Sequence, residues 1–184
     1  MKSNKILLLA LAFASGCLCI GACAVLGGLA LIYPSVTNAM ATNSTLAIGE
    51  MAPDFQLETL TGETLTLSQF RGQPVLLSIG TTWCPSCRGE APFLQGLHER
   101  QTGLVILAID SEEEAQTVQE YADELGLTYP IALDLDGAVS DAYGVWAIPT
   151  NLLIDEDGYI RARIIDSLTE DHLAAMLENA GISP

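Results

Sequence analysis

Two apolar runs, residues 75–79 and 104–109, lie on either side of a segment with a helical pattern. Apolar runs of this length without regular polar alternation are typical of strands buried on both faces of a sheet. The segment between them, residues 85–101, begins with Pro85, where a first helical turn tolerates proline, and is followed by Gly103. A strand, a helix and a second strand in this order pair in parallel with a right-handed crossover. The chain therefore predicts an α/β fold.

Shorter patterns extend this unit on both sides. Residues 55–57 and 64–67 flank Thr61-Gly62 and predict a short N-terminal hairpin. Ser111 with Glu114 has the spacing of a capping box and predicts the start of a second helix. The other expected features are the end of that helix near Gly126, a short edge segment at 129–133, a brief helix at 138–143, a hairpin of 151–154 and 159–164, and a last helix from Thr169 to Gly181. The expected architecture is a mixed central β-sheet flanked by helices, with an N-terminal β-hairpin extension.

The first 33 residues differ in character from the rest of the chain. No charged residue occurs between Lys5 and Glu50, and residues 6–33 are largely apolar. At a rise of ~1.5 Å per residue this run gives roughly 42 Å of helix, enough to cross a hydrocarbon core of about 30 Å. Because the lysines precede the run, the N-terminus is expected in the cytoplasm and the remainder outside. We expect a membrane anchor or signal segment at 1–33, a flexible linker at 34–48 and one domain at 49–184.

Three fates of this leader are compatible with its sequence. An uncleaved single-pass anchor is favoured because the apolar run exceeds the 7–15 residues usual for the core of a signal peptide. Cleavage after Ala41 would release a secreted protein, since Ala39-Met40-Ala41 fits the small-residue pattern of cleavage sites. Lipid modification of Cys23 is the third possibility, because Ile20-Gly21-Ala22 precedes it in a lipobox-like order.

The charge of the chain is strongly acidic. It carries 23 Asp and Glu against 7 Lys and Arg, a formal net charge of −16. Nucleic acid is therefore not an expected partner, because phosphate binding requires the opposite sign. Solubility and the steering of basic partner proteins are two effects that such a charge can have.

Cys84 and Cys87 form a C-x-x-C pair at the junction between the first apolar run and the helix that follows it. A thiolate at a helix N-terminus faces unpaired N–H groups and the positive end of the helix dipole, which stabilise it. Cys84 is therefore placed to attack a disulfide and Cys87 to resolve the product. The other cysteines, Cys17, Cys19 and Cys23, lie in the leader, so the domain is not a disulfide-stapled scaffold.

Several motifs in order resemble one known family over residues 49 to about 180. Trp83-Cys84-Pro85-Ser86-Cys87 followed by Pro92, and Ile148-Pro149-Thr150 before a hairpin, resemble the thioredoxin fold. Ala52-Pro53-Asp54-Phe55, Leu60-Thr61-Gly62, Leu67-Ser68 and Arg71-Gly72-Gln73-Pro74 resemble the start of membrane-tethered TlpA/ResA-like thiol-disulfide oxidoreductases. The chain departs from that family at Ser78 and at Ile79-Gly80-Thr81-Thr82.

The resemblance implies roles for the residues around the cysteines. Cys84 would be the exposed nucleophile and Cys87 the buried resolving thiol. Pro149 would be a cis proline against the pair, so that the backbone of Ile148 could align an extended substrate chain. Trp83 would shield one side of the sulfurs and contact partners, although a packing aromatic would look the same.

Glu90 lies three residues after Cys87, about one helical turn, so both side chains can share one side of the helix. In ResA-like members a glutamate at this spacing tunes the protonation of the cysteines. A partly desolvated carboxyl could exchange protons with Cys87. The alternative is a surface glutamate that compensates the helix dipole.

The resemblance implies reduction of protein disulfides, with apocytochrome c or other secreted proteins as substrates and a membrane-embedded electron donor. No cofactor and no metal are expected. Disulfide donation uses the same residues and remains open. A peroxidase is a second reading, because peroxiredoxins share Ala52-Pro53-Asp54-Phe55, but the Pro-x-x-x-Thr-x-x-Cys spacing is missing. Metal binding is a third, weakened by the lack of a second cysteine pair and by only two histidines, His98 and His172.

Overall fold

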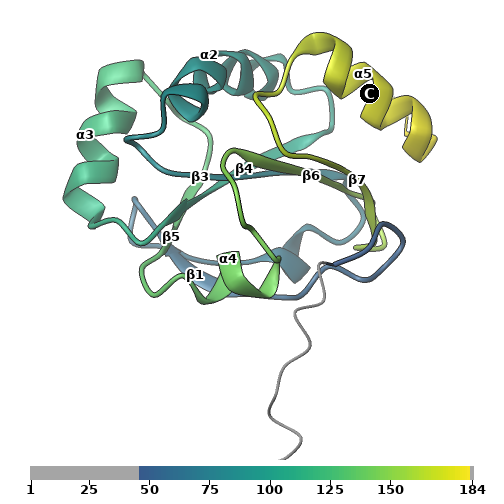
Figure 1. Cartoon of the computed structure of the whole chain (residues 1–184), viewed down its shortest axis with the longest axis horizontal. Helices are drawn as coiled ribbons and strands as arrows, with labels where there is room; N and C mark the ends of the chain where they lie inside the picture. The colour runs from purple at the N-terminus through teal and green to yellow at the C-terminus, as the bar shows by residue number, and fades with distance from the viewer. Residues whose placement is uncertain (1–45, 183–184) are drawn as a thin grey trace, which may run out of the picture. The chain divides into compact units, whose positions relative to one another are not determined.

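A computed structural model describes residues 46–182 of the chain, which contain a seven-stranded mixed sheet in the order β2-β1-β5-β4-β3-β6-β7 (Figure 1). The strands are β1 (Gln56–Thr59), β2 (Thr64–Thr66), β3 (Val75–Gly80), β4 (Val105–Ser111), β5 (Ile131–Asp134), β6 (Thr150–Ile154) and β7 (Ile160–Ile164). The helices are η1 (Leu67–Phe70), α2 (Pro85–Arg100), α3 (Ala115–Leu125), α4 (Ala138–Ala142) and α5 (Glu170–Ala180). The predicted mixed sheet flanked by helices, with its N-terminal hairpin of β1 and β2, is confirmed.

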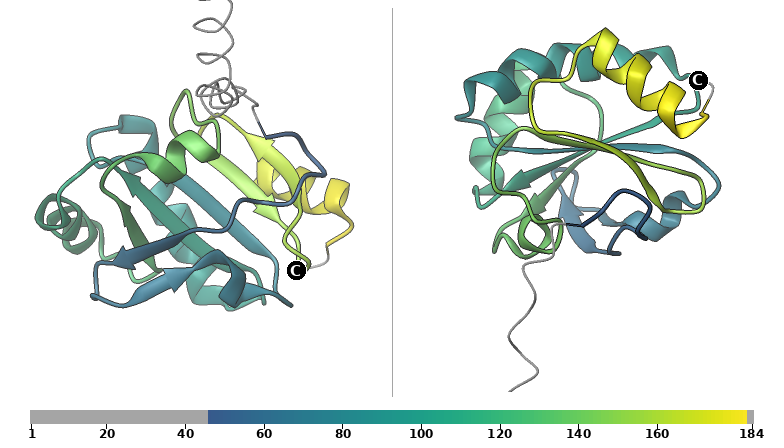
Figure 2. Two further views of the ribbon diagram at one scale, coloured as in Figure 1. Left: turned by 90° about the horizontal axis from the view of Figure 1, so that it is seen from below. Right: turned by 45° about the vertical axis from the view of Figure 1, so that its right-hand side comes forward.

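Alternate residues of the central strands supply two separate hydrophobic cores. Leu76 and Ile106 face the core that the sheet forms with α2, α3 and α5. Leu77 and Leu107 face the other core, which the sheet forms with η1 and α4. All four of these side chains are essentially inaccessible to solvent. Figure 2 shows α4 (green) on the side of the sheet opposite α2 and α5. This explains why the strands have continuous apolar sequences: both faces of the sheet are covered.

Parallel pairing in the middle of the sheet positions the cysteine pair. β3 pairs in parallel with β4, and β4 with β5, so α2 and α3 are the predicted crossover helices. β6 runs antiparallel to β3 on the other side, with Ile79 opposite Thr150. The loop after β3 carries Cys84, and Pro149 directly precedes β6. Two segments more than sixty residues apart in sequence therefore meet at the carboxyl end of β3.

Two expectations about the second half of the chain are wrong. β5 is an interior strand, because β1 pairs with it antiparallel on the side away from β4. The predicted capping box also fails: α3 begins after Glu114, which is its N-cap and makes no side-chain cap hydrogen bond. Ser111 instead ends β4, and its hydroxyl accepts a hydrogen bond from Ser140 at 2.9 Å. A left-handed φ of 62° at Glu112 separates the strand from the helix.

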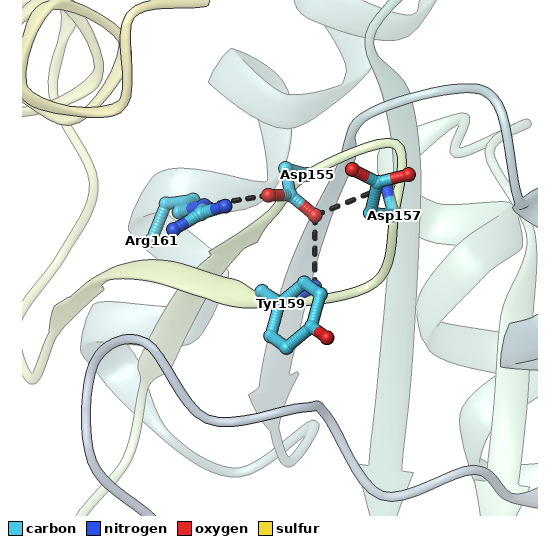
Figure 3. A network of polar contacts seen from close by, with 4 residues as sticks. All are labelled: Asp155, Asp157, Tyr159 and Arg161. Atoms are coloured by element: carbon cyan, nitrogen blue, oxygen red, sulfur yellow. Dashed lines mark hydrogen bonds and ion pairs between the residues drawn. The ribbon is translucent and has the colours of Figure 1, made fainter.

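The turn between β6 and β7 is held by a small polar network around Asp155 (Figure 3). Its carboxylate accepts backbone N–H groups from Asp157 at 3.1 Å and Tyr159 at 2.8 Å and pairs with Arg161. Burial alone would raise the pKa of Asp155, but the hydrogen bonds and the Arg161 charge hold it below its ordinary value. The predicted hairpin of these two strands is confirmed.

The predicted anchor at 1–33 and most of the predicted linker at 34–48 lie outside the described residues. Within residues 46–182, no helix is both long enough and apolar enough to cross a membrane.

Candidate redox-active site

Cys84 is the N-cap of α2 and Pro85 is its first residue. The Cys84 backbone is extended (φ −76°, ψ 117°), and its Sγ accepts a hydrogen bond from the Cys87 N–H at 3.3 Å. A negative charge on this sulfur thus faces a donor and the positive end of a 16-residue helix. Proline fits here because a first-turn residue has no helical partner for its N–H.

The expectation of an exposed Cys84 is wrong. Cys84 is 5% exposed and Cys87 is 7% exposed, so both sulfur-bearing side chains are buried. Cys84 is covered because the loop before β6 comes close to the start of α2: its Sγ lies 3.9 Å from the Ile148 carbonyl oxygen. The two cysteines are free thiols in this structure.

Cys87 lies on the side of α2 that packs against β3. Burial raises the pKa of its thiol, and the Cys84 sulfur and the Glu90 carboxyl raise it further. The sulfur also packs directly against β3: a β-carbon at Gly80 would lie 2.9 Å from Cys87 Sγ and 3.3 Å from its Cβ. Position 80, where the chain departs from the family, is thus a glycine against which the Cys87 side chain packs.

Replacing Gly80 with alanine should destabilise the protein by about 1–3 kcal/mol, because the added methyl group overpacks against Cys87. Urea unfolding of the reduced protein measures this. Gly89→Ala is the matched control, since a β-carbon there meets nothing within 4 Å and an exposed helical alanine stabilises by about 0.5–1 kcal/mol. Equal stabilities of the two variants would contradict the packing of Gly80 against the sulfur.

Glu90 is 3% exposed, which excludes the alternative of a surface glutamate. Its carboxylate accepts hydrogen bonds from Ser78 Oγ at 2.9 Å, Asn151 Nδ2 at 3.1 Å and the Leu168 N–H at 2.7 Å. Burial raises its pKa, and these three donors only partly offset that effect. Glu90 and Cys87 line one small cavity of about 40 Å³. A carboxyl with a raised pKa therefore lies on the same side of α2 as the resolving thiol.

Asp110 is a buried carboxyl that the sequence reasoning missed. It stands opposite Gly80 in the β3–β4 register, is 5% exposed and lines the same cavity as Cys87. Burial and the neighbouring Glu113 carboxylate raise its pKa to about 8. One of its oxygens, Oδ1, has no hydrogen-bond partner among the described residues. The available signal was an acidic residue at the carboxyl end of a strand paired in parallel with β3.

The remaining predicted residues lie around the mouth of the site. Trp83 is 69% exposed, and the Ile148–Pro149 peptide bond is cis, as predicted. Trp83 and Ile148 line a groove of about 490 Å³ beside the cysteines. Trp146, which the sequence reasoning did not single out, lines the same groove and is 74% exposed. Their role in substrate contact stays a prediction.

The described residues hold no evident metal centre. No group of three or more His, Cys, Asp or Glu within 46–182 is arranged to hold a metal ion. The chemistry that the geometry does provide is that of a reduced dithiol: one sulfur at a helix N-terminus, a second sulfur one turn later, and a buried carboxyl beside the second.

Comparison with known proteins agrees with this chemistry. The family model described as the AhpC/TSA family matches residues 48–163. The chain is 35% identical over 152 residues to the thiol-disulfide oxidoreductase ResA of Geobacillus kaustophilus, covering 82% of this chain and 87% of that protein. It is 36% identical over 151 residues to ResA of Halalkalibacterium halodurans, covering 81% and 86% respectively.

Solved structures show the same likeness. A putative protein disulfide isomerase from Bacteroides thetaiotaomicron has a TM-score of 0.65 at 31% identity, over 74% of this chain and 89% of that one. A putative thiol:disulfide interchange protein DsbE from Chlorobium tepidum has a TM-score of 0.68 at 26% identity, over 73% and 98%. The thioredoxin domain of a Bacteroides vulgatus thiol-disulfide oxidoreductase has a TM-score of 0.63 at 25% identity, over 72% and 96%. The chain belongs to the AhpC/TSA family and is a thiol-disulfide oxidoreductase of the ResA type with a thioredoxin-like fold.

Proposed function

We propose that this oxidoreductase works as a reductant of disulfides in secreted proteins, with apocytochrome c among its substrates. Residues 1–33 hold it in a membrane, and the domain faces the extracytoplasmic side. The observation that carries the direction is the modest stabilisation of the attacking sulfur. Strong disulfide donors stabilise the thiolate of their reduced form, whereas among the described residues the Cys84 Sγ accepts a hydrogen bond from one donor, the Cys87 N–H, and no cationic side chain pairs with it. A dithiol whose reduced form is stabilised less gives up its electrons more readily.

The reaction begins at Cys84. Its thiolate attacks one sulfur of the substrate disulfide, a Cys84–substrate disulfide forms, and the other substrate sulfur leaves as a thiolate that takes up a proton. The 3.3 Å hydrogen bond from the Cys87 N–H and the helix N-terminus stabilise the attacking thiolate. The Ile148 carbonyl, 3.9 Å from Cys84 Sγ, marks the backbone beside which the substrate chain aligns.

Cys87 completes the exchange. Its thiol passes a proton to the Glu90 carboxylate, and the resulting thiolate attacks Cys84 Sγ. The mixed disulfide breaks, the second substrate sulfur leaves as a thiolate and is protonated, and a Cys84–Cys87 disulfide forms. Two electrons have then moved from the cysteine pair to the substrate. A membrane-embedded dithiol donor returns the pair to the reduced state, so the cycle needs no bound cofactor.

Glu90→Gln should slow the resolution step by about 10²-fold, the lower end of the effects expected when a general base is lost. The attack by Cys84 should keep its rate, because the amide retains the shape of the side chain. Rapid-quench alkylation across pH would show a mixed disulfide that accumulates in the variant, and resolution that requires a higher pH.

Glu99→Gln is the matched control for this variant, since Glu99 is an exposed glutamate of the same helix. Unchanged resolution kinetics in Glu90→Gln across the whole pH range would show that Glu90 only fills space.

Equilibration of the full chain with a series of redox buffers tests the direction of the proposed reaction. A single two-electron transition of the Cys84–Cys87 pair at or below about −200 mV supports a reductant. A transition near −120 mV, roughly that of a strong donor, would reverse the proposal. Peroxide consumption at a rate exceeding disulfide reduction would favour the peroxidase alternative instead.

A further inference from the structure

A groove of about 490 Å³ runs beside the cysteine pair, and all of its charged lining residues are acidic. It is formed by the loop after β3, the loop after β4, the start of α4 and the loop before β6. Four acidic residues line it: Glu112, Glu113, Asp136 and Asp141. Among the described lining residues none is Lys or Arg. We call this surface the acidic groove.

One of the four carboxylates is held in place by hydrogen bonds, and a second belongs to a residue whose backbone is held. Glu113 accepts hydrogen bonds from the Thr82 N–H and, at 2.7 Å, from the Thr82 hydroxyl. Glu112 lies closely against Gly137, where a β-carbon would come within 3.3 Å of its Cδ. Its backbone also bonds across to β5, through the Asp134 carbonyl at 2.9 Å. The negative potential of the groove is therefore built into the loop that follows β4.

The walls of the acidic groove are apolar and exposed. Trp83 and Trp146 are 69% and 74% exposed, the highest values among the large hydrophobic side chains of the described residues. Val145 and Ile148 lie on the same surface. Exposed aromatic side chains beside a site are typical of protein contact surfaces, which combine aromatic anchors with a polar rim.

A third feature points to a polar ligand group. Thr81 is 8% exposed and lines the acidic groove, yet its hydroxyl has no hydrogen-bond partner among the described residues. Buried polar atoms are nearly always paired, so the Thr81 hydroxyl is a polar group for which the described residues supply no partner. Thr81 also lines the small cavity that contains Cys87, so it lies between that cavity and the acidic groove.

We infer that the acidic groove selects substrate segments in which the disulfide cysteine is flanked by Lys or Arg and by an apolar residue. The inference rests on the proposed function and narrows its substrate class to cationic, extended polypeptide segments. The basic side chains meet the four carboxylates, the apolar one lies between the two tryptophans, and acidic segments are repelled by like charge. The formal net charge of −16 adds attraction at longer range.

Peptide disulfides of equal length test this inference, with the cysteine flanked by lysines, by serines or by glutamates. The reduced full chain should show a kcat/KM about tenfold or more higher for the lysine peptide than for the glutamate peptide at low salt. That preference should shrink strongly near 1 M salt, where screening is effective within about 3 Å. A small uncharged dialkyl disulfide reports whether the dithiol reacts at all.

Charge-neutral variants then locate the source of the preference. Asp136→Asn combined with Asp141→Asn should reduce the lysine-to-glutamate ratio by about threefold or more, because two of the four carboxylates are removed. Asp171→Asn is the control, since this exposed residue of α5 does not line the acidic groove. Trp146→Ala should raise KM for the lysine, serine and glutamate peptides alike.

Equal kcat/KM values for the three peptides, with the small disulfide still reduced, would overturn the inference and leave the proposed function standing. Failure to reduce even the small disulfide would sink the proposed function itself. If the Asp136→Asn/Asp141→Asn variant keeps the full lysine-to-glutamate ratio of kcat/KM, the selecting charges lie elsewhere. That result would also overturn the inference.

Discussion

Cys84→Ser is expected to lower the rate of protein disulfide reduction by at least about 10³-fold, because a serine hydroxyl cannot replace the thiolate as nucleophile. The fold should be kept, since serine can also serve as the N-cap of α2. The change removes only the sulfur that accepts the Cys87 N–H. Insulin reduction, followed by turbidity in the presence of excess dithiothreitol, measures the effect once the uncatalysed rate is subtracted.

Cys87→Ser is the companion variant, and it should fail at a different step. Cys84 can still attack, but no second thiol releases the substrate, so mixed disulfides accumulate. Non-reducing gels of the full chain should show these adducts for Cys87→Ser and none for Cys84→Ser. Equal trapping by both variants would refute the assigned order of attack.

Asp110→Asn is expected to change how stability depends on pH. The Asp110 pKa of about 8 in the folded protein lies far above the ordinary value of 3.8. Between these two values the folded state keeps a proton that the unfolded state has lost. The free energy of unfolding therefore falls as pH rises, by up to about 1.4 kcal/mol per pH unit from this group, and levels off above pH 8. The asparagine variant lacks this contribution.

Urea unfolding of wild type and variant from pH 4 to 9 measures the difference. The two proteins should be of similar stability at the acid end, since the asparagine amide can donate to Glu113 as the protonated carboxyl does. The variant should become progressively more stable than wild type toward pH 8. Asp123→Asn, on the exposed side of α3, is the control and should show no such trend. Parallel curves for Asp110→Asn and wild type would mean that the pKa of Asp110 in the folded protein stays at its ordinary value.

Local sequence patterns were sufficient to predict the elements at the centre of the fold. The strand, helix and strand around the cysteine pair were predicted from apolar runs and from Pro85 because each signal lies within a few residues of the element it marks. The β6–β7 hairpin was predicted equally well, since its turn contains its own stabilising residues around Asp155. The thioredoxin-like architecture followed from several short motifs in order.

Long-range pairing explains what the sequence could not supply. β5 looks like an edge segment because nothing near it indicates that β1, more than seventy residues earlier, pairs with its outer side. Ser111 and Glu114 have the spacing of a capping box, but Ser111 pairs with β5 as part of β4, and its hydroxyl accepts a hydrogen bond from Ser140. The burial of Cys84 depends on the Ile148 loop, which comes from a distant part of the chain.

The candidate site shows the same contrast between local sequence signals and long-range contacts. Helical spacing placed Glu90 on the side of Cys87, but its hydrogen-bond donors Ser78, Asn151 and Leu168 come from three separate segments. Asp110 was missed because its importance arises only when β4 pairs with β3. Trp146 was missed because an isolated tryptophan before a strand carries no signal of exposure.

The measurement that tests the central claim most directly is disulfide mapping after a single turnover. The reduced full chain is mixed with one equivalent of an oxidised peptide, alkylated, and examined by intact mass and peptide mapping. The account predicts one new disulfide joining Cys84 to Cys87, one equivalent of reduced peptide, and unchanged thiols at Cys17, Cys19 and Cys23. Reduced peptide without a Cys84–Cys87 disulfide, or a disulfide that includes one of the other three cysteines, would contradict it.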